Sequence, residues 1–205
     1  MAKTGLMYPV FAPITKETFG EKPTYGTGFV IGEGISANIT LNYGDNPLYA
    51  NNREVNNDRS FTGGTIALGV DDYGASKELS KTAKDTLLGY GTDEIEENVS
   101  YIGSTPPAPF GGTGYYKTAK YRDDGGVSYE AVWIYKTQYI KTADNAKTKG
   151  SSVEWQTPEL EGKIYQVAGL PSDRDIMEEA TFATEAEARA WLNGKANITS
   201  SAASE

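Results

Sequence analysis

The chain has 205 residues, with 19 basic and 28 acidic side chains and a formal net charge of -9. It contains neither cysteine nor histidine, which excludes disulfides, zinc–thiolate sites, thiolate nucleophiles and the most common general base. We therefore expect no catalytic, metal or cofactor site, and the acidic balance disfavours a protein that gains affinity by neutralising phosphates.

The composition is typical of a mainly β domain. Glycine (23 residues) and tyrosine (14 residues) are abundant, and stretches that favour helix are confined to two places. The length suits one domain with a core of its own. No signal peptide is predicted, and no stretch reaches the roughly 20 apolar residues that cross a bilayer, so we expect synthesis and folding in the cytoplasm.

The first predicted strand covers residues 6–12. Pro9 interrupts it, and because proline cannot donate a ladder hydrogen bond, we expect an edge position or an extended N-terminal arm, residues 1–14. Residues 15–27 are rich in glycine, proline, threonine and charge and are predicted as a loop. Residues 28–31 return to extended structure.

The clearest strand pattern lies at residues 35–43, where apolar and polar side chains alternate. A second alternating strand is predicted at residues 61–70, with a bulge or bend at its two adjacent glycines. Alternation places the apolar side chains of each strand on one face, which we expect to be buried. The predicted core face consists of Ile35, Ile39, Leu41, Ile66, Leu68 and Val70.

Between these strands, residues 43–60 form a long polar connection. A connection of this length without structure of its own is unusual in a compact domain and is often functional. Its apolar anchors are Leu48, Tyr49 and Val55. We expect this segment to become ordered against a neighbouring molecule.

The next elements are a helix and a weak strand. Leu79, Ala83 and Leu87 recur every four residues, which predicts an amphipathic helix over residues 75–88. A weaker strand is predicted at residues 94–102.

A β-hairpin is predicted at residues 114–122 and 127–140, because the two aspartates and two glycines between them suit a tight reversal. The middle of its second arm is apolar on both faces, so we expect it to be covered on both sides. Residues 151–156 and 159–167 are predicted as two strands or as one strand kinked at Pro158, and a last strand is predicted at residues 176–182.

The last predicted element is a helix. Thr184 and Glu187 form a capping box at its start, and Gly194 is predicted to end it. The apolar stripe of this helix consists of Ala188, Trp191 and Leu192. Residues 199–205 are predicted as a flexible tail.

Several residue groups allow other interpretations. The aromatic side chains of the long strands, with Trp133 and Trp155, could line a sugar site of a carbohydrate-binding or adhesion module, although strand aromatics are more often core. Acidic pairs such as Asp71 and Asp72 lack the alternating ligand pattern of a calcium loop and favour turn roles. Possible glycosidase carboxylates are Glu130, Glu154 and Glu159.

The sequence resembles one known family along most of its length. The segments that carry the resemblance are residues 3–13 (KTGLMYPVFAP), 25–28 running into 35–38, 60–72 (SFTGGTIALGVDD), 149–158, and 184–193. Their order and content are similar to the major tail proteins of Gram-positive siphophages and prophages. Each segment is weakly specific alone, but their order along the chain makes the resemblance specific.

The resemblance implies a β-sandwich or barrel-like tail-tube fold, in which two packed sheets are flanked by a helix. Such subunits form hexameric rings that stack into a tube. One sheet of each copy joins a barrel around the lumen, which holds the tape-measure protein and then passes DNA without binding it specifically. The same fold occurs in type VI secretion tubes, so a subunit of such a tube is an alternative.

The resemblance also implies partners and contacts. A tail terminator and a distal tail protein would close the ends of a tube assembled in the host cytoplasm and carried in the virion tail, with no membrane involved. The long connection at residues 43–60 would mediate ring stacking, with Tyr49 and Arg53 as leading contacts. The full set of stacking candidates is Leu48, Tyr49, Arg53, Val55 and Arg59.

Overall fold

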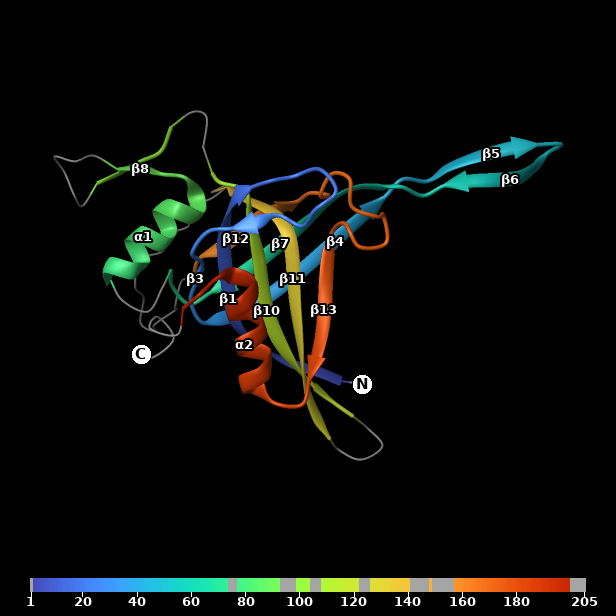
Figure 1. Cartoon of the computed structure of the whole chain (residues 1–205). Helices are drawn as coiled ribbons and strands as arrows, with labels where there is room; N and C mark the ends of the chain where they lie inside the picture. The colour runs from blue at the N-terminus through green and yellow to red at the C-terminus, as the bar shows by residue number, and fades with distance from the viewer. Residues whose placement is uncertain are drawn as a thin grey trace.

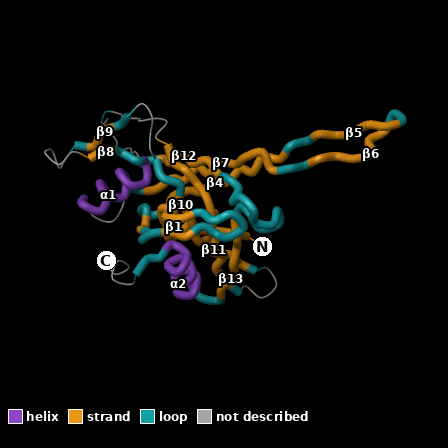
Figure 2. Tube along the Cα trace, turned by 45° about the horizontal axis from the view of Figure 1, so that its top comes forward, coloured by secondary structure: helices purple, strands orange, loops and turns teal. Residues whose placement is uncertain are grey.

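The computed structural model describes residues 2–73, 77–92, 99–103, 108–121, 126–140, 148 and 157–199. In this part the protein is mainly β, with one large antiparallel sheet and two helices (Figures 1 and 2). Neither helix is long and apolar enough to cross a membrane. The strands are β1 (Ala2–Lys16), β2 (Thr24–Tyr25), β3 (Phe29–Val30), β4 (Gly34–Tyr43), β5 (Asn46–Ala50), β6 (Arg53–Asp58), β7 (Phe61–Val70), β8 (Gly91–Thr92), β9 (Ser100–Tyr101), β10 (Gly111–Lys120), β11 (Val127–Ile140), β12 (Glu159–Ile164) and β13 (Met177–Phe182); the helices are α1 (Lys77–Leu88) and α2 (Glu185–Ala196).

The large sheet forks at β11. Its order is β2–β1–β10–β11–β12–β7–β4, with β3 beside β1 and β13 beside β11. Strand β10 occupies one edge of β11. On the other edge, the first half of β11 pairs with β13 and the last four residues pair with β12. The fork lets β12, β7 and β4 turn away from the layer formed by β1, β10, β11 and β13 (Figure 1).

Two hydrophobic cores lie on opposite faces of the β1–β10–β11 layer. Along β11, Val132 and Ile134 join one core, whereas Ala131, Trp133 and Tyr135 join the other. This alternation confirms that the middle of β11 is covered on both sides. The first core packs this layer against β7, β12 and α1, and the second packs it against α2. The result is the sandwich-like, mainly β architecture that the sequence predicts.

The N-terminal segment is a strand of the main sheet. The predicted edge position is wrong at Val10 and Phe11, where β1 pairs with β10 on one side and with β3 on the other, and Phe11 is fully buried. Before Val10, the described strand that pairs with β1 is β10 alone. Residues 2–14, expected to form an arm, therefore belong to the sheet. Pro9 is accommodated because it lies in a register shift between Met7 and Val10, where the strand needs no ladder donor.

The predicted core face of β4 and β7 is buried except at the start of β4. Ile66, Leu68 and Val70 are fully buried, and Ile39 and Leu41 pack against the same core. Ile35 was expected on this face, but it is 55% exposed. A register shift between Gly34 and Ser36 turns its side chain away from the core.

The boundaries of the other elements differ in part from expectation. The predicted hairpin over β10 and β11, the helix α1 and the strand β13 are present, and the Thr184–Glu187 capping box starts α2. Gly194 does not end α2, which continues to Ala196 and is capped by Asn197 in the left-handed conformation. Predictions for residues 94–98, 123–125, 151–156 and 200–205 lie outside the described residues.

Candidate functional site: a projecting hairpin and open strand edges

The polar connection at residues 43–60 is not structureless, because it folds into the β5–β6 hairpin. Asn51 and Asn52 form its turn with φ angles of 51° and 60°. Two successive residues with positive φ are the pattern of a type I′ turn, which matches the right-handed twist of the strands it joins. Asparagine tolerates this conformation better than other non-glycine residues do. The local sequence therefore specifies a two-residue reversal at the tip.

The base of the hairpin is continuous with the main sheet. The Gly44 amide donates to the Ser60 carbonyl at 2.8 Å, and the rings of Tyr43 and Phe61 meet edge to face at 6.0 Å between centroids. The ribbon formed by β4 and β7 thus runs on into β5 and β6, which project from the body of the protein (Figures 1 and 2). Seven residues from Gly44 to the turn give a reach of roughly 20 Å.

Apolar side chains on the hairpin face solvent. The exposed fractions are 60% for Leu48, 64% for Tyr49 and 48% for Val55. Every residue of β5 is exposed. A two-stranded hairpin is only marginally stable alone in water. Burial of these exposed apolar side chains against another molecule would therefore stabilise this hairpin.

The five stacking candidates divide into two groups. Leu48, Tyr49, Arg53 and Val55 lie on the projecting strands, with Arg53 paired in register with Ala50 beside the turn. Arg59 lies at the base instead, where its Nε is 3.6 Å from a carboxylate oxygen of Asp45. Both members of this ion pair are highly exposed, so it contributes little to stability.

Several strand edges of the main sheet are open in the part of the chain described above. There, β4 pairs with β7 alone, β13 with β11 alone, and the two-residue strands β2 and β3 with β1 alone. Monomeric proteins protect such edges with charged residues, prolines or bulges. Strand β4 (GISANITLNY) contains neither a charged residue nor a proline, and its pairing with β7 is regular from Ser36 to Asn42. It is therefore an unprotected edge, suited to pairing with another strand.

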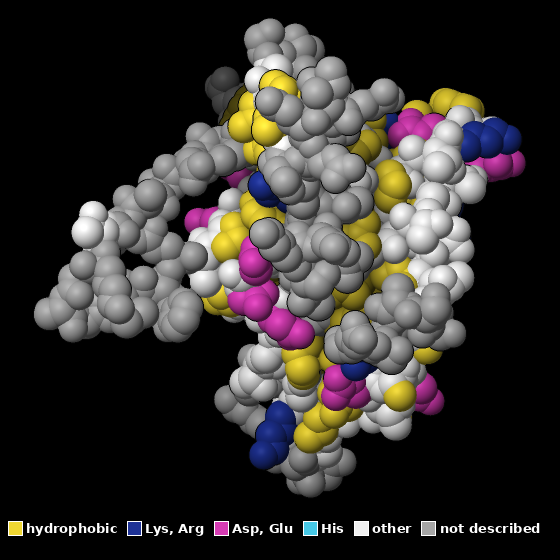
Figure 3. All heavy atoms as spheres, turned by 90° about the vertical axis from the view of Figure 1, so that its left-hand side faces the viewer, with side chains coloured by type: hydrophobic (Ala, Val, Ile, Leu, Met, Phe, Trp, Pro, Cys, Tyr) yellow, Lys and Arg dark blue, Asp and Glu magenta, His cyan; other side chains and the backbone are white. Residues whose placement is uncertain are grey.

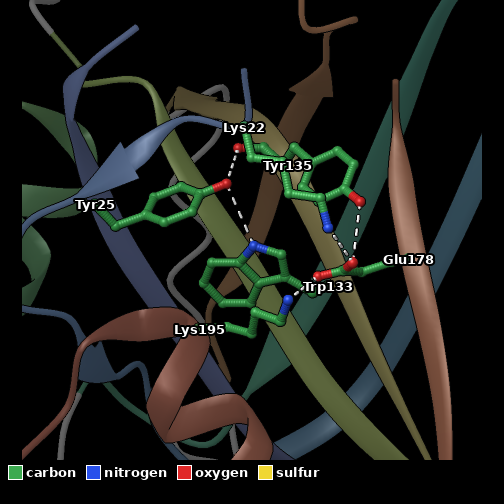
Figure 4. Close-up of polar contacts among 6 residues, drawn as sticks. All are labelled: Lys22, Tyr25, Trp133, Tyr135, Glu178 and Lys195. Atoms are coloured by element: carbon green, nitrogen blue, oxygen red, sulfur yellow. Dashed lines mark hydrogen bonds and ion pairs between the residues drawn. The ribbon is translucent and has the colours of Figure 1, made fainter. Parts of the chain in front are cut away.

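A polar network fastens the segment before β3 to the side of the sheet that α2 covers (Figure 4). The Glu178 carboxylate accepts hydrogen bonds from Lys22 at 2.6 Å and from the Tyr135 hydroxyl at 3.1 Å, and it forms an ion pair with Lys195. Tyr25 donates to the Tyr135 carbonyl at 2.8 Å. The network joins β2, β11, β13 and α2 and has a structural role.

The charges in this network shift the ionisation of its members. Burial alone would raise the pKa of the Glu178 carboxyl, but the hydrogen bonds from Lys195 and Lys22 outweigh it and hold that pKa below its ordinary value. The bond to Glu178 in turn raises the pKa of Lys22. Burial raises the pKa of the Tyr25 phenol. All three groups therefore keep one charge state at neutral pH.

The residues of the alternative interpretations are placed differently. Trp133 is fully buried and donates to the Tyr25 hydroxyl at 3.3 Å, so it cannot present a ring to a sugar. Glu130 is nearly buried beside Lys117 at 3.3 Å, and Asp71 accepts the Glu33 amide at 2.7 Å, a turn role. Glu154 and Trp155 lie outside the described residues.

No group of three or more acidic side chains that could hold a metal ion occurs among the described residues. On the face drawn in Figure 3, the coloured acidic and basic side chains are interspersed and form no basic patch of the kind that binds nucleic acid. The hairpin and the open edges are the described features suited to contact with another molecule.

No protein-family model matches the chain, and no curated protein matches it.

Proposed function

We propose that this chain is the major tail protein of a long, non-contractile bacteriophage tail, a non-enzymatic subunit that forms hexameric rings stacked into a tube. One observation carries the proposal. A hairpin with three exposed apolar side chains projects from a sheet whose strand β4 pairs with β7 on one side and, among the described residues, is open and unprotected on the other. These two features provide contacts in two directions, as a stacked ring requires, and they accompany the sequence resemblance given above.

The open edges support ring formation. A strand edge with free N–H and C=O groups favours pairing with another strand. A head-to-tail arrangement of identical subunits around a closed ring satisfies the edge of every copy. The β4 edge of one subunit would pair with a different edge of the next, and β13 is a described strand that offers one.

The hairpin supports stacking of rings. It extends the β4–β7 ribbon beyond the body of the subunit (Figure 1) and bares Leu48, Tyr49 and Val55. Aromatic side chains are enriched at the centres of protein interfaces, so Tyr49 is the leading anchor. Arg53, in register with Ala50 beside the turn, is the leading polar contact.

The charge balance supports a passive conduit. A net charge of -9 disfavours contacts that neutralise DNA phosphates. Each such contact would add affinity for DNA and slow its movement. In the proposed virion tail, assembled in the host cytoplasm, the lumen would first hold the tape-measure protein and then pass DNA. A tail terminator and a distal tail protein would bind the two ends.

Negative-stain electron microscopy of the purified protein at increasing concentration tests the proposal. We expect rings or hollow tubes. In a matched variant, Asn-Gly replaces residues 47–57, which retains the Asn46–Asp58 pair and closes it with a type I′ turn. This variant should fold and remain a monomer or an unstacked ring.

Two results would contradict the proposal. A wild-type protein that stays monomeric at high concentration and binds a glycan array would indicate the adhesion alternative. Wild-type-length tubes from the shortened variant would refute the stacking role of the hairpin. Neighbouring genes for a tape-measure protein and a tail terminator distinguish a phage tail from a secretion tube.

A further inference from the structure

Both faces of the β5–β6 hairpin carry an apolar side chain. Leu48 and Tyr49 are consecutive residues of β5, and consecutive side chains of a strand point to opposite faces. The register shift between them adds its extra residue on β6, because Leu48 pairs with Asn56 and Tyr49 pairs with Glu54. Strand β5 therefore keeps its alternation, and Leu48 and Tyr49 lie on opposite faces of the hairpin.

Neither of these faces is buried by the rest of the described chain. Every residue of β5 is exposed, and the hairpin stands clear of the body in both views (Figures 1 and 2). The middle of β11 is also apolar on both faces, and there each face is covered by a different core. A strand that lies on one surface alternates instead, as Asn38, Ile39 and Thr40 do in β4, where Ile39 packs on the core and its neighbours are exposed. The pattern of the hairpin therefore indicates burial on two sides.

The two faces of the hairpin also differ in charge. Arg53 pairs with Ala50, which lies two residues after Leu48 in β5 and therefore on the same face. Glu54 pairs with Tyr49 and lies on the face of Tyr49. Near the turn, one face thus presents an aliphatic side chain and a cation, and the other face presents an aromatic ring and an anion.

The seam between two subunits of a ring fits a ribbon of this kind. In a ring closed head to tail, each seam is formed by two different surfaces of the same chain. A hairpin with two unlike faces matches two unlike walls, whereas a flat contact with one subunit would leave one face bare. The numbers also agree, because a closed ring has one seam for each subunit and each subunit supplies one hairpin.

We propose that each hairpin inserts into the seam between two neighbouring subunits of the adjacent ring. Leu48 and Arg53 contact one of these subunits, and Tyr49 and Glu54 contact the other. This inference rests on the proposed tube and specifies the partner, since each hairpin binds two copies of the chain at once. A free subunit offers only one wall of a seam and a closed ring offers both, so stacking is coupled to ring closure.

Photo-crosslinking in mixed tubes counts the partners of one hairpin. The photo-crosslinking amino acid p-benzoylphenylalanine is introduced at Leu48, at Tyr49, or at both positions. Each labelled protein is assembled with a large excess of wild-type chain, so that a labelled hairpin has wild-type neighbours. The tubes are irradiated and the products are separated under denaturing conditions. The doubly labelled protein irradiated as a free subunit, below the concentration at which tubes form, is the control and should give no crosslinked oligomer.

We expect covalent dimers from each single label, and peptide mapping should place the crosslinks from positions 48 and 49 on different surfaces of the chain. The double label should add a covalent trimer of one labelled and two wild-type chains. Dimers alone from the double label, with both positions crosslinked to one surface, would overturn the two-subunit contact and leave the tube proposal intact. Absence of tubes from the wild-type chain would instead refute the proposed function and this inference with it.

Single substitutions provide a second measurement that needs no label. Leu48→Thr and Tyr49→Thr each remove the apolar contact on one face, and each should raise the critical concentration for tubes roughly fivefold. An effect confined to one of the two variants would indicate a hairpin that lies on a single surface, which would also overturn the two-subunit contact.

Discussion

Replacing the apolar side chains of the hairpin should weaken stacking without unfolding the subunit. The variant carries Leu48→Thr, Tyr49→Thr and Val55→Thr. Threonine keeps a high strand propensity, so the hairpin itself is retained. Since the three side chains are 60%, 64% and 48% exposed, we expect each substitution to change the free energy of unfolding by less than about 0.5 kcal/mol.

The effect on assembly follows from the same exposed fractions. Complete burial of a large apolar side chain contributes roughly 1.5–3 kcal/mol, and about half to two-thirds of that remains available at each position. The three together offer about 3–5 kcal/mol per hairpin. Threonine retains one methyl group, so we take the lower value. At about 1.4 kcal/mol per tenfold change, each stacking contact should weaken roughly 100-fold.

The assay is the critical concentration for tube formation, measured by pelleting and light scattering. Val127→Thr is the matched control, because Val127 is 48% exposed like Val55 but lies at the start of β11, away from the hairpin. The control should polymerise like the wild type. A triple variant with an unchanged critical concentration and an intact circular dichroism spectrum would refute the reasoning.

Two further predictions concern the subunit itself. Glu178→Gln removes the carboxylate that Lys22 and Lys195 share, and should lower the free energy of unfolding by about 1–3 kcal/mol at pH 7. Because the folded-state pKa of Glu178 lies below its ordinary value of 4.5, this stabilisation is present above pH 4.5 and is lost as pH falls through the folded pKa. The unfolding free energies of the wild type and of Glu178→Gln, measured by urea melts, should therefore converge as pH falls through that range. A difference that stays constant with pH would contradict the stabilising role of the Glu178 carboxylate. Gly28→Ala places a Cβ against the carbonyl oxygens of Ala196 and Phe11 and should lower the free energy of unfolding by about 1–3 kcal/mol. Gly194→Ala lies inside α2, where the added Cβ meets nothing within 4 Å, and should raise it by about 0.5–1 kcal/mol. A Tm of Gly28→Ala above that of Gly194→Ala would show that α2 does not approach Gly28 closely.

Local sequence patterns predicted the elements that are determined by residues close together in the chain. The alternation along residues 127–140 gave both faces of β11, and the Thr184–Glu187 spacing gave the start of α2. The predicted end of α2 was wrong because Gly194 does not adopt the left-handed conformation that ends a helix. Asn197, three residues further on, adopts it instead.

Long-range pairing accounts for what the sequence did not predict. Pro9 indicated an edge, but only the partner strands β3 and β10 reveal that a bulge accommodates it inside the sheet. The stacking candidates came from the resemblance and the apolar residues of a polar segment. That the segment is a hairpin could have been inferred from Asn51-Asn52, a pair suited to a type I′ turn, between two short strands. The register across β4, β7 and β12 likewise depends on pairings between distant segments, which no local pattern contains.

The pairing of β1 with β10 sets the order of events during synthesis. Ala2 is in register with Lys120, so the first strand leaves the ribosome long before its partner exists, and β11 receives β13 later still. Contacts so distant in sequence make folding slow. Strand β7, which pairs with β4, also receives β12 only late in synthesis. In the proposed tube, the sheet that presents the β4 edge would therefore be complete only once β12 has been made, which would delay polymerisation until then.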